Sequence, residues 1–312
     1  MILMIIEQRL TETYEVIKKQ LRYQAITPLI LTLATTFSLR DENFNVKKYN
    51  TLKEEVKKQT GIFSYLRSNI GIVLPYLMAQ PNEAQAVQQL LNNYECLIEH
   101  KFVRSNFSYL AATYVQDEAH VERAYAYYTA LRNYHPFLTT QDDTPYAVLL
   151  TIDAYDVEER ATTVHHYVKA LVEQGYYKGN DLLWLAQILT IDTTAYQPER
   201  IEAVLRVEQQ LKRQGIKKKQ RNYVLMGILA FLDYNDTQIA AIINLAKTIE
   251  KLPQYKWYKQ YALYSAVQIT LYVARSDLHD KLSATLLTAI ETAVQSQQLA
   301  ATIALSNSSN HS

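Results

Sequence analysis

Eight polar residues with side chains suited to catalysis or ligand binding recur in similar local contexts along the chain. They are His100, Arg104, His135, Asp142, Asp143, Lys178, Asn180 and Asp181. Two histidines and three carboxylates are compatible with a hard or borderline metal ion or with acid–base chemistry, because both need titratable groups that converge within hydrogen-bond reach. Whether any such chemistry is possible depends on how the surrounding elements position these residues.

The eight residues lie in or beside a sequence pattern that recurs about every 39 residues. In each copy a turn residue is followed by aromatic or aliphatic residues, then by a polar turn and an apolar segment that contains small residues. The copies begin at Gly61, His100, His135, Gly175, Gly215 and Pro253, which are 35 to 40 residues apart. A repeat of this length is typical of stacked helix pairs.

Each copy predicts two helices of different polarity. The first is apolar nearly all round, as in 223–230, which is typical of an inner helix squeezed between neighbours. The second is amphipathic and is predicted at 158–174 and 198–214, among others. Gly175 and Gly215 follow these amphipathic helices directly, where glycine commonly ends a helix.

We expect the helix pairs to stack around a continuous core, because one pair of this length cannot bury its apolar faces alone. The predicted fold is all-α, a right-handed α-solenoid of antiparallel helix pairs. In outline it resembles tetratricopeptide or HEAT arrays, although the tetratricopeptide signature is absent. A single domain is expected over 1–304, with N-terminal capping helices in 1–60 (7–23, 26–40 and 44–60), repeats in 61–255, C-terminal helices in 256–304 (256–275 and 278–304) and a disordered tail at 305–312.

Composition restricts the class of protein. Glycine and proline are scarce, at 6 and 7 of 312 residues, which disfavours β-rich folds and long linkers. Cys96 is the single cysteine, so no disulfide forms within the chain, which fits a reducing compartment. No segment reaches the ~20 apolar residues of a membrane span. We therefore expect a cytoplasmic protein.

Charge restricts the partners. The formal net charge is only +1, so no overall field attracts nucleic acid or an anionic membrane, and either partner would need a local patch. The densest basic run, 217–221, is predicted to be a solvated turn, with a phosphate or an acidic partner as the alternative. We expect neither nucleic acid nor a membrane as a partner.

Four segments carry a family resemblance. They begin at Phe63, Phe102, His135 and Gly175. Together with an alanine-rich C-terminal stretch and a polar tail, they resemble an uncharacterised bacterial family, domain of unknown function 4003, over nearly the whole chain. The fifth copy of the repeat departs from this pattern, because lysines occupy 217–219 where an aromatic residue is expected. The resemblance implies a bacterial, single-domain protein and implies no activity.

Equivalent turns of a repeat lie along one edge of a stack, so we expect the eight polar residues to form a row on one rim, with neighbouring repeats ~10 Å apart. Helix capping is a competing explanation for several of them. The segment 142–145, Asp-Asp-Thr-Pro, precedes an apolar helix and suits an N-cap followed by proline. Asn180 or Asp181, just before Leu182, suits the same capping role.

The leading functional hypothesis is a protein- or peptide-binding scaffold that uses the concave face of the stack. The alternative is an enzyme or a metal-dependent site on the rim around His135, Asp142, Asp143 and Asp181. Phosphate-cradling glycine loops and the Gly-x-Ser-x-Gly and His-Glu-x-x-His motifs are absent from the sequence. We therefore expect no enzyme, no cofactor and no bound metal, and the sequence leaves the oligomeric state open.

Overall fold

The computed structural model describes residues 2–22, 24–40 and 43–274, together with 282, 284–286, 288–290 and 292. In this part of the chain all regular secondary structure is helical and no strand occurs. The predicted all-α fold is confirmed. No helix in the same part of the chain is both long and apolar enough to cross a membrane.

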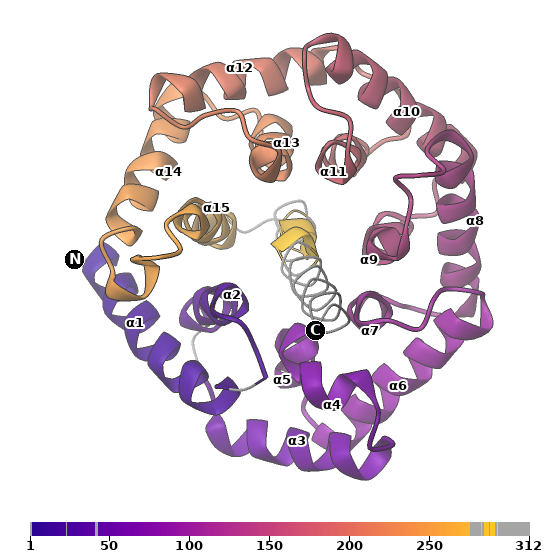
Figure 1. Cartoon of the computed structure of the whole chain (residues 1–312), viewed down its shortest axis with the longest axis vertical. Helices are drawn as coiled ribbons and strands as arrows, with labels where there is room; N and C mark the ends of the chain where they lie inside the picture. Colours follow the sequence, from indigo (N-terminus) through magenta and orange to yellow (C-terminus); the bar gives the residue numbers. More distant parts are fainter. Residues whose placement is uncertain are drawn as a thin grey trace, which may run out of the picture.

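The helices form two concentric layers, which Figure 1 shows from one end. The outer layer consists of α1 (Ile2–Leu21), α3 (Val46–Gln59), α6 (Glu83–Glu99), α8 (Glu118–Tyr134), α10 (Val157–Glu173), α12 (Glu199–Arg213) and α14 (Asp236–Ile249). The inner layer consists of α2 (Thr27–Ser38), α4 (Tyr65–Asn69), α5 (Leu74–Ala79), α7 (Asn106–Ala112), α9 (Thr144–Leu150), α11 (Asn180–Ile188), α13 (Tyr223–Phe231) and α15 (Gln260–Ala274). Short 3-10 turns flank several inner helices, namely η1 (Ile70–Val73), η2 (Gln141–Asp143), η3 (Gln220–Asn222) and η4 (Pro253–Tyr255).

The layers close into a ring, because α2 near the start of the chain packs against α15 near its end. Thr35 Oγ1 donates to Ser265 Oγ at 3.0 Å, and the Tyr255 hydroxyl lies 2.8 Å from the same Ser265 oxygen. The predicted right-handed α-solenoid, with separate helices covering each end of the stack, is therefore not confirmed. Each helix pair is rotated in the same sense relative to the one before it, and the accumulated rotation makes the first and last pairs neighbours.

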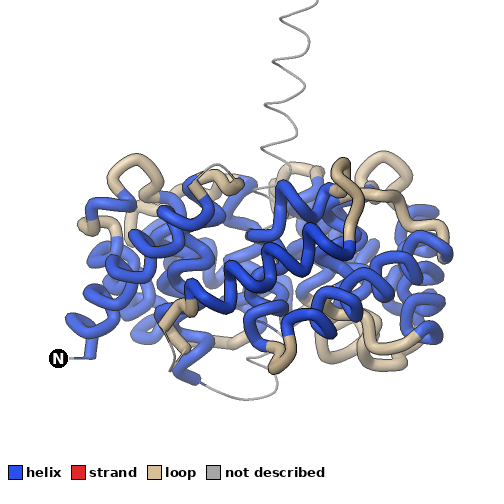
Figure 2. The backbone as a smooth tube through the Cα atoms, turned by 90° about the horizontal axis from the view of Figure 1, so that it is seen from below, coloured by secondary structure: helices blue, strands red, loops and turns tan. Residues whose placement is uncertain are grey.

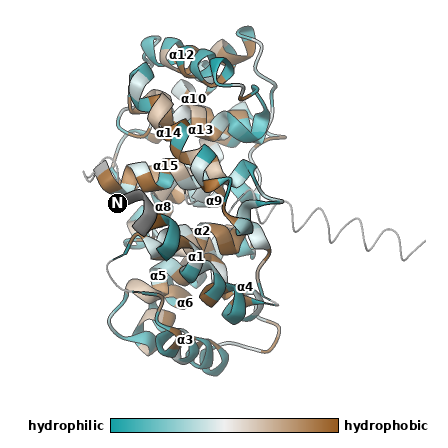
Figure 3. Ribbon diagram, turned by 90° about the vertical axis from the view of Figure 1, so that its left-hand side faces the viewer, coloured by the Kyte–Doolittle hydropathy of each residue, from teal (hydrophilic) through white to brown (hydrophobic). Residues whose placement is uncertain are grey.

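The two layers differ in burial as the sequence predicts. All seven residues of α9 and residues 223–230 of α13 are buried. Gly227 permits a close approach of α13 to α11, since a Cβ atom there would lie 3.3 Å from Leu185 Cγ. Outer helices bury one face only, and Figure 3 shows hydrophilic residues over α3 and α12 but apolar residues on α2.

The ends of the outer helices agree with prediction to within a few residues where the sequence pattern is strong. The predicted helices 158–174 and 198–214 correspond to α10 and α12, and the first three predicted helices correspond to α1, α2 and α3. The predicted helix 256–275 begins later, at Gln260, because the η4 turn and the residues after it intervene. Most of the predicted helix 278–304 and all of the tail 305–312 lie outside the described residues.

A left-handed turn follows three of the outer helices. Gly175 and Gly215 have φ values of 77° and 82°, as expected for glycines that end a helix, and Lys101 has φ 70° at the equivalent position. The backbone N–H of the next residue then bonds back to the helix, as from Tyr176 N to Leu171 O at 3.1 Å. This turn satisfies carbonyl groups that the end of the helix would otherwise leave unpaired.

The left-handed turn also determines which side chains face solvent. The residue after the left-handed position packs into the hydrophobic core, so Phe102 and Tyr176 are buried. The residue after that one is directed outward, so Val103 and Tyr177 are exposed. Lys217 occupies the same outward position in the fifth copy of the repeat, which explains why an aromatic residue can be replaced there by lysine.

The described residues between 282 and 292 lie inside the ring (Figure 1). Leu282, Leu286 and Ile290 are fully buried there. Thr288 Oγ1 donates to the Tyr114 hydroxyl at 3.0 Å, which links this segment to the inner layer. The interior of the ring is therefore occupied in part by the chain itself.

The closed ring predicts that Ser265→Asp is strongly destabilising. The carboxylate would be buried between α2 and α15 beside Tyr255 and Thr35, so we expect a loss of about 3 kcal/mol or more in the free energy of unfolding, measured by urea denaturation. Ser265→Ala, which removes only one neutral hydrogen-bonding group, is the control and is expected to cost about 1 kcal/mol. Equal effects of the two substitutions would contradict the closure.

Candidate functional site

The connections between helices lie on two opposite faces of the ring (Figure 2). Because consecutive outer and inner helices run antiparallel, the described residues of the outer-to-inner connections lie on one face; they are 22, 24–26, 60–64, 100–105, 135–143, 174–179, 214–222 and 250–259. Those of the inner-to-outer connections lie on the other face; they are 39–40, 43–45, 80–82, 113–117, 151–156, 189–198 and 232–235. All eight candidate residues of the sequence belong to, or directly follow, outer-to-inner connections.

Asp143 is the most buried of the candidates and is fully bonded. Its Oδ2 accepts from Thr140 N at 3.0 Å. Its Oδ1 accepts from Trp184 Nε1 at 3.1 Å and from Gln187 Nε2 at 3.2 Å, both on α11. The carboxyl therefore ties the turn before α9 to the neighbouring inner helix.

Asp142 and Asn180 are brought together by adjacent turns. Asn180 Nδ2 donates to Asp142 Oδ2 at 2.8 Å, and Thr140 Oγ1 bonds the other carboxylate oxygen. Asp181 is close enough to Asp142 that the two carboxylates repel each other, and this repulsion adds to burial in raising the pKa of Asp181. The expected row on the rim thus exists for this part of the candidate set.

Capping explains much of this cluster. Asp143 occupies the N-cap position of α9 and Pro145 lies in its first turn, as predicted, but the Asp143 side chain forms no cap bond to α9. It accepts instead from Thr140 N, which completes a capping box around η2. For α11 the capping prediction is wrong, since its N-cap is Gly179, which forms no side-chain cap. Asn180 and Asp181 lie inside the first turn of that helix instead.

Burial changes the protonation of this cluster. Burial of Asp143, reinforced by the charge of Asp142, raises the pKa of Asp143 to about 8 in spite of its three donors. The nearby Tyr146 hydroxyl is buried without a hydrogen-bond partner, and burial raises its pKa far above the ordinary range. Both groups are therefore neutral near pH 7, and neither has the exposure that a reactant would need.

The remaining candidates lie apart from the aspartates. His135 is buried, and its ring centroid is 5.2 Å from that of His165. Burial and the positive charges of His165 and Lys178 lower the pKa of His135 to about 4, so it is neutral at pH 7. Lys178 lies in the next outer-to-inner connection, 174–179, and its side chain is exposed.

The partners of His100 and Arg104 lie on α6 and at the start of α8, outside the aspartate cluster. Arg104 forms a two-pronged ion pair with Glu95, with distances of 3.1 and 3.0 Å. His100 Nδ1 lies 2.8 Å from Cys96 O, and its Nε2 is 3.9 Å from Glu118 Oε1. All eight residues therefore lie on one face, but the polar contacts of His100 and Arg104 are separate from the bond that links Asp142 and Asn180.

The spacing of Cys96 and His100, four residues apart on α6, was not recognised from the sequence as a contact. The Cys96 sulfur lies 3.8 Å from His100 Nδ1, and Glu118 lies beyond the ring. This resembles a nucleophile–base–carboxylate arrangement, but the close carbonyl at Nδ1 indicates that this nitrogen carries a proton and cannot accept one from the thiol. Burial and three surrounding glutamates also raise the pKa of Cys96, which disfavours the thiolate.

Metal ligation has no support in the described part of the chain, where no three histidine, cysteine, aspartate or glutamate residues are placed to hold one ion. The buried carboxyl groups of Asp142 and Asp143 are engaged by N–H and O–H donors. These bonds link the turn before α9 to α11, which is a structural role.

The feature that sequence reasoning missed is a set of exposed apolar side chains. Among the described residues, eight large apolar side chains are more than half exposed, and all but Val273 lie on one face. The seven on this face are Ile62, Phe63, Tyr65, Val103, Phe137, Tyr177 and Trp257. We call the face formed by the outer-to-inner connections the aromatic face. The recurring turn residues of the sequence were a signal for these positions.

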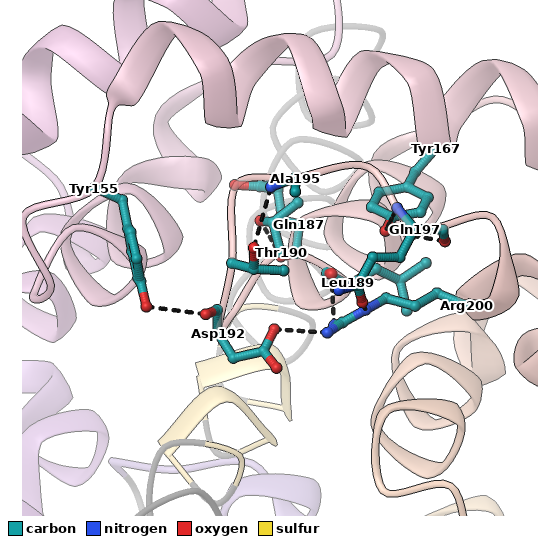
Figure 4. A network of polar contacts seen from close by, with 10 residues as sticks. Tyr155, Tyr167, Gln187, Leu189, Thr190, Asp192, Ala195, Gln197 and Arg200 are labelled. Atoms are coloured by element: carbon teal, nitrogen blue, oxygen red, sulfur yellow. Dashed lines mark hydrogen bonds and ion pairs between the residues drawn. The ribbon is translucent and has the colours of Figure 1, made fainter.

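The opposite face, formed by the inner-to-outer connections, is acidic and internally bonded. We call it the acidic face. Its described carboxylates are Asp117, Asp153, Asp156, Asp192 and Asp233. Figure 4 shows one part of it, in which Tyr155 donates to Asp192 O at 2.9 Å and Arg200 binds Asp192 Oδ1 at 2.7 Å. These bonds connect successive loops and leave few groups free for a ligand.

Comparison with known proteins identifies the family. Residues 13–299 match the family described as "Protein of unknown function (DUF4003)". The chain belongs to this family. It is also 23% identical over 310 residues to "Uncharacterized protein YeaA" of Bacillus subtilis (strain 168), an alignment that covers 95% of this chain and 92% of the relative. No solved structure is significantly similar to the chain. The family membership confirms the resemblance seen in the sequence.

The raised pKa of Asp143 predicts a pH dependence of stability. The folded protein holds a proton that the unfolded chain releases near the ordinary value of 3.8, so unfolding becomes easier as the pH rises from 3.8 to about 8. Asp143→Asn removes this titration, so we expect its melting temperature to change less with pH over that window than that of the wild type.

Asp143→Asn is also expected to be less stable than the wild type at low pH, by about 1–3 kcal/mol, because an amide nitrogen would face N–H donors. Thermal denaturation at a series of pH values measures both effects. Parallel pH profiles for the two proteins would show that Asp143 ionises normally.

Proposed function

We propose that this protein is a protein- or peptide-binding scaffold and that the inner wall of the ring is its binding surface. The observation that carries the proposal is that the wall already accommodates one segment, the described residues between 282 and 292 of the same chain. Leu282, Leu286 and Ile290 are spaced four residues apart, so they lie along one stripe of a helix and are all buried. A segment with this stripe is the kind of ligand that the wall suits.

Polar contacts on the inner wall support the same proposal. The Tyr114 hydroxyl at the end of α7 lies 3.5 Å from Ala284 O and accepts from Thr288 Oγ1 at 3.0 Å. Such hydroxyl contacts can fix the register of a bound helix along an apolar surface. Beside this segment a cavity of about 370 Å³ remains between α2, α5, α7 and α15, so the resident segment does not fill the interior.

The rim site has weaker support as a catalytic centre. The one observation in its favour is that the buried Asp143, with its raised pKa, lies next to a second carboxyl group, that of Asp142. Each described hydrogen bond to Asp143, however, joins structural elements of the ring, and the carboxyl has no exposure to a substrate. We therefore propose binding and not catalysis.

The proposal predicts that weakening the resident segment exposes a binding surface. A fluorescent peptide with the sequence of residues 278–304 is titrated into the full chain, and binding is followed by fluorescence anisotropy. The wild type is expected to bind weakly, because its own segment competes at an effective concentration on the order of millimolar. Leu286→Asp, which places a charge in the buried stripe, is expected to bind at least about tenfold more tightly.

Val16→Asp, on the exposed side of α1, is the matched control for added charge and is expected to bind like the wild type. Circular dichroism checks that each variant is folded, and the milder Leu282→Ala replaces Leu286→Asp if the latter is not. If the folded variants bind the peptide no better than the wild type, the inner wall is simply part of the core and the proposal fails.

A further inference from the structure

The aromatic face exposes apolar side chains to a degree that folding does not require. Phe63 and Phe137 are 94% and 92% exposed, and Trp257 and Tyr177 are 79% and 74% exposed. Each lies on a different outer-to-inner connection, so they are distributed around the ring and do not form one patch. A side chain this exposed gains almost nothing from burial in the core, so the stability of the fold does not require an apolar residue at these positions.

Basic side chains accompany these apolar tips. The described residues of the outer-to-inner connections include Lys101, Lys178, Lys217, Lys218, Lys219, Lys251, Lys256 and Lys259. Lys218 is paired with Glu208 at 3.2 Å. For the other seven lysines, no carboxylate of the described residues lies within ion-pair distance. The only acidic residues of the same connections are Glu250 and the buried pair Asp142 and Asp143.

The opposite face has the reverse character. Its described connections carry five aspartates, and their one basic residue, Arg40, is partly buried and donates to Pro75 O at 3.1 Å. The net charge of +1 therefore conceals a separation of charge between two faces of one ring. A chain with this small net charge needs a local basic patch to bind an anionic membrane or nucleic acid. The aromatic face carries such a patch.

We propose that the aromatic face docks on the surface of an anionic lipid bilayer, with the aromatic tips inserted at the level of the headgroups and the lysines opposite lipid phosphates. The geometry favours a bilayer over a protein partner. Aromatic tips spread over one face of a ring need a broad, flat and deformable partner, whereas a protein would need a separate pocket for each tip. Tryptophan, tyrosine and phenylalanine flanked by lysine are typical of interfacial contact with lipids.

The aromatic face is distinct from the inner wall proposed to bind a peptide, so either proposal can fail without the other. The residues of the docking surface lie on loops outside the two helical layers. Replacing them leaves the buried stripe of Leu282, Leu286 and Ile290 untouched. A variant of the aromatic face is thus expected to bind the peptide of residues 278–304 as the wild type does.

Flotation with lipid vesicles tests the docking surface. The full chain is mixed with vesicles of equal parts phosphatidylglycerol and phosphatidylcholine, or of phosphatidylcholine alone, at a salt concentration of about 0.05 M. We expect flotation with the anionic vesicles only, and release at about 0.5 M salt, where charges are screened over a few ångströms. Of the two tryptophans, Trp184 is buried and Trp257 is exposed. The fluorescence emission of Trp257 is therefore expected to shift to shorter wavelength when the residue leaves water for the lipid surface.

Two variants separate the contributions of the tips and the lysines. Phe63→Ser combined with Phe137→Ser retains Trp257 as a reporter and is expected to lower the bound fraction at least about tenfold. Lys217→Glu combined with Lys219→Glu is expected to do the same by replacing attraction with repulsion. Val16→Ser, at an exposed apolar position on the outer wall, is the matched control and is expected to bind like the wild type.

Three results would overturn the inference. One is the absence of flotation with anionic vesicles at low salt, and a second is equal binding to both kinds of vesicle. The third is equal binding by the wild type and the Phe63→Ser, Phe137→Ser variant with no shift in Trp257 emission, since charge alone would then explain the association. Retention of an acidic protein by the aromatic face, without vesicle binding, would likewise assign the face to a protein partner.

Discussion

The inner helices α9, α11 and α13 bury nearly all of their residues, and much of the ring follows from this constraint. In α13, for example, all residues from Tyr223 to Ala230 are buried. Such a helix needs cover from an outer helix behind it, from an inner neighbour on each flank, and from something in front of it. Closure of the ring gives α2 and α15 their missing neighbours, and the buried residues Leu282, Leu286 and Ile290 supply cover on the inward side.

Local features of the fold could be predicted from the sequence, while its closure could not. The ends of α10 and α12 follow from amphipathic periodicity and from Gly175 and Gly215, whose left-handed turns are local in origin. Closure depends on the rotation between successive pairs, which arises from packing at many positions at once. The bond between Thr35 and Ser265 joins residues 230 positions apart, and no local pattern encodes it.

The candidate site was predictable only where one turn contacts the next. The N-cap position of Asp143 before α9 follows from the residues around it, and the bond between Asn180 and Asp142 agrees with the equivalence of neighbouring turns. His100 and Arg104 occupy the same kind of turn, but their carboxylate partners are Glu118 at the start of α8 and Glu95 on α6. They therefore share the face of Asp142 and Asn180 without joining the contact between them. A repeat fixes the face on which a side chain lies, and the identity of its neighbours decides what it contacts.

Part of the charge separation between the two faces follows from the alternation of helices. Outer helices begin at the acidic face, where Asp117 and Asp156 cap α8 and α10 by accepting backbone N–H groups at 2.8 Å. They end at the aromatic face, where basic residues in the last turns of α12 and α14 complement the helix dipole, whereas α6 and α10 have no basic residue there. Helix electrostatics therefore accounts for part of the charge on each face. It does not account for Phe63, Phe137 or Trp257, because helix electrostatics gains nothing from an exposed ring. The left-handed turn requires an outward side chain at only some of these positions, and Lys217 shows that this side chain need not be apolar. The stability of the ring therefore leaves the exposed aromatic side chains unexplained.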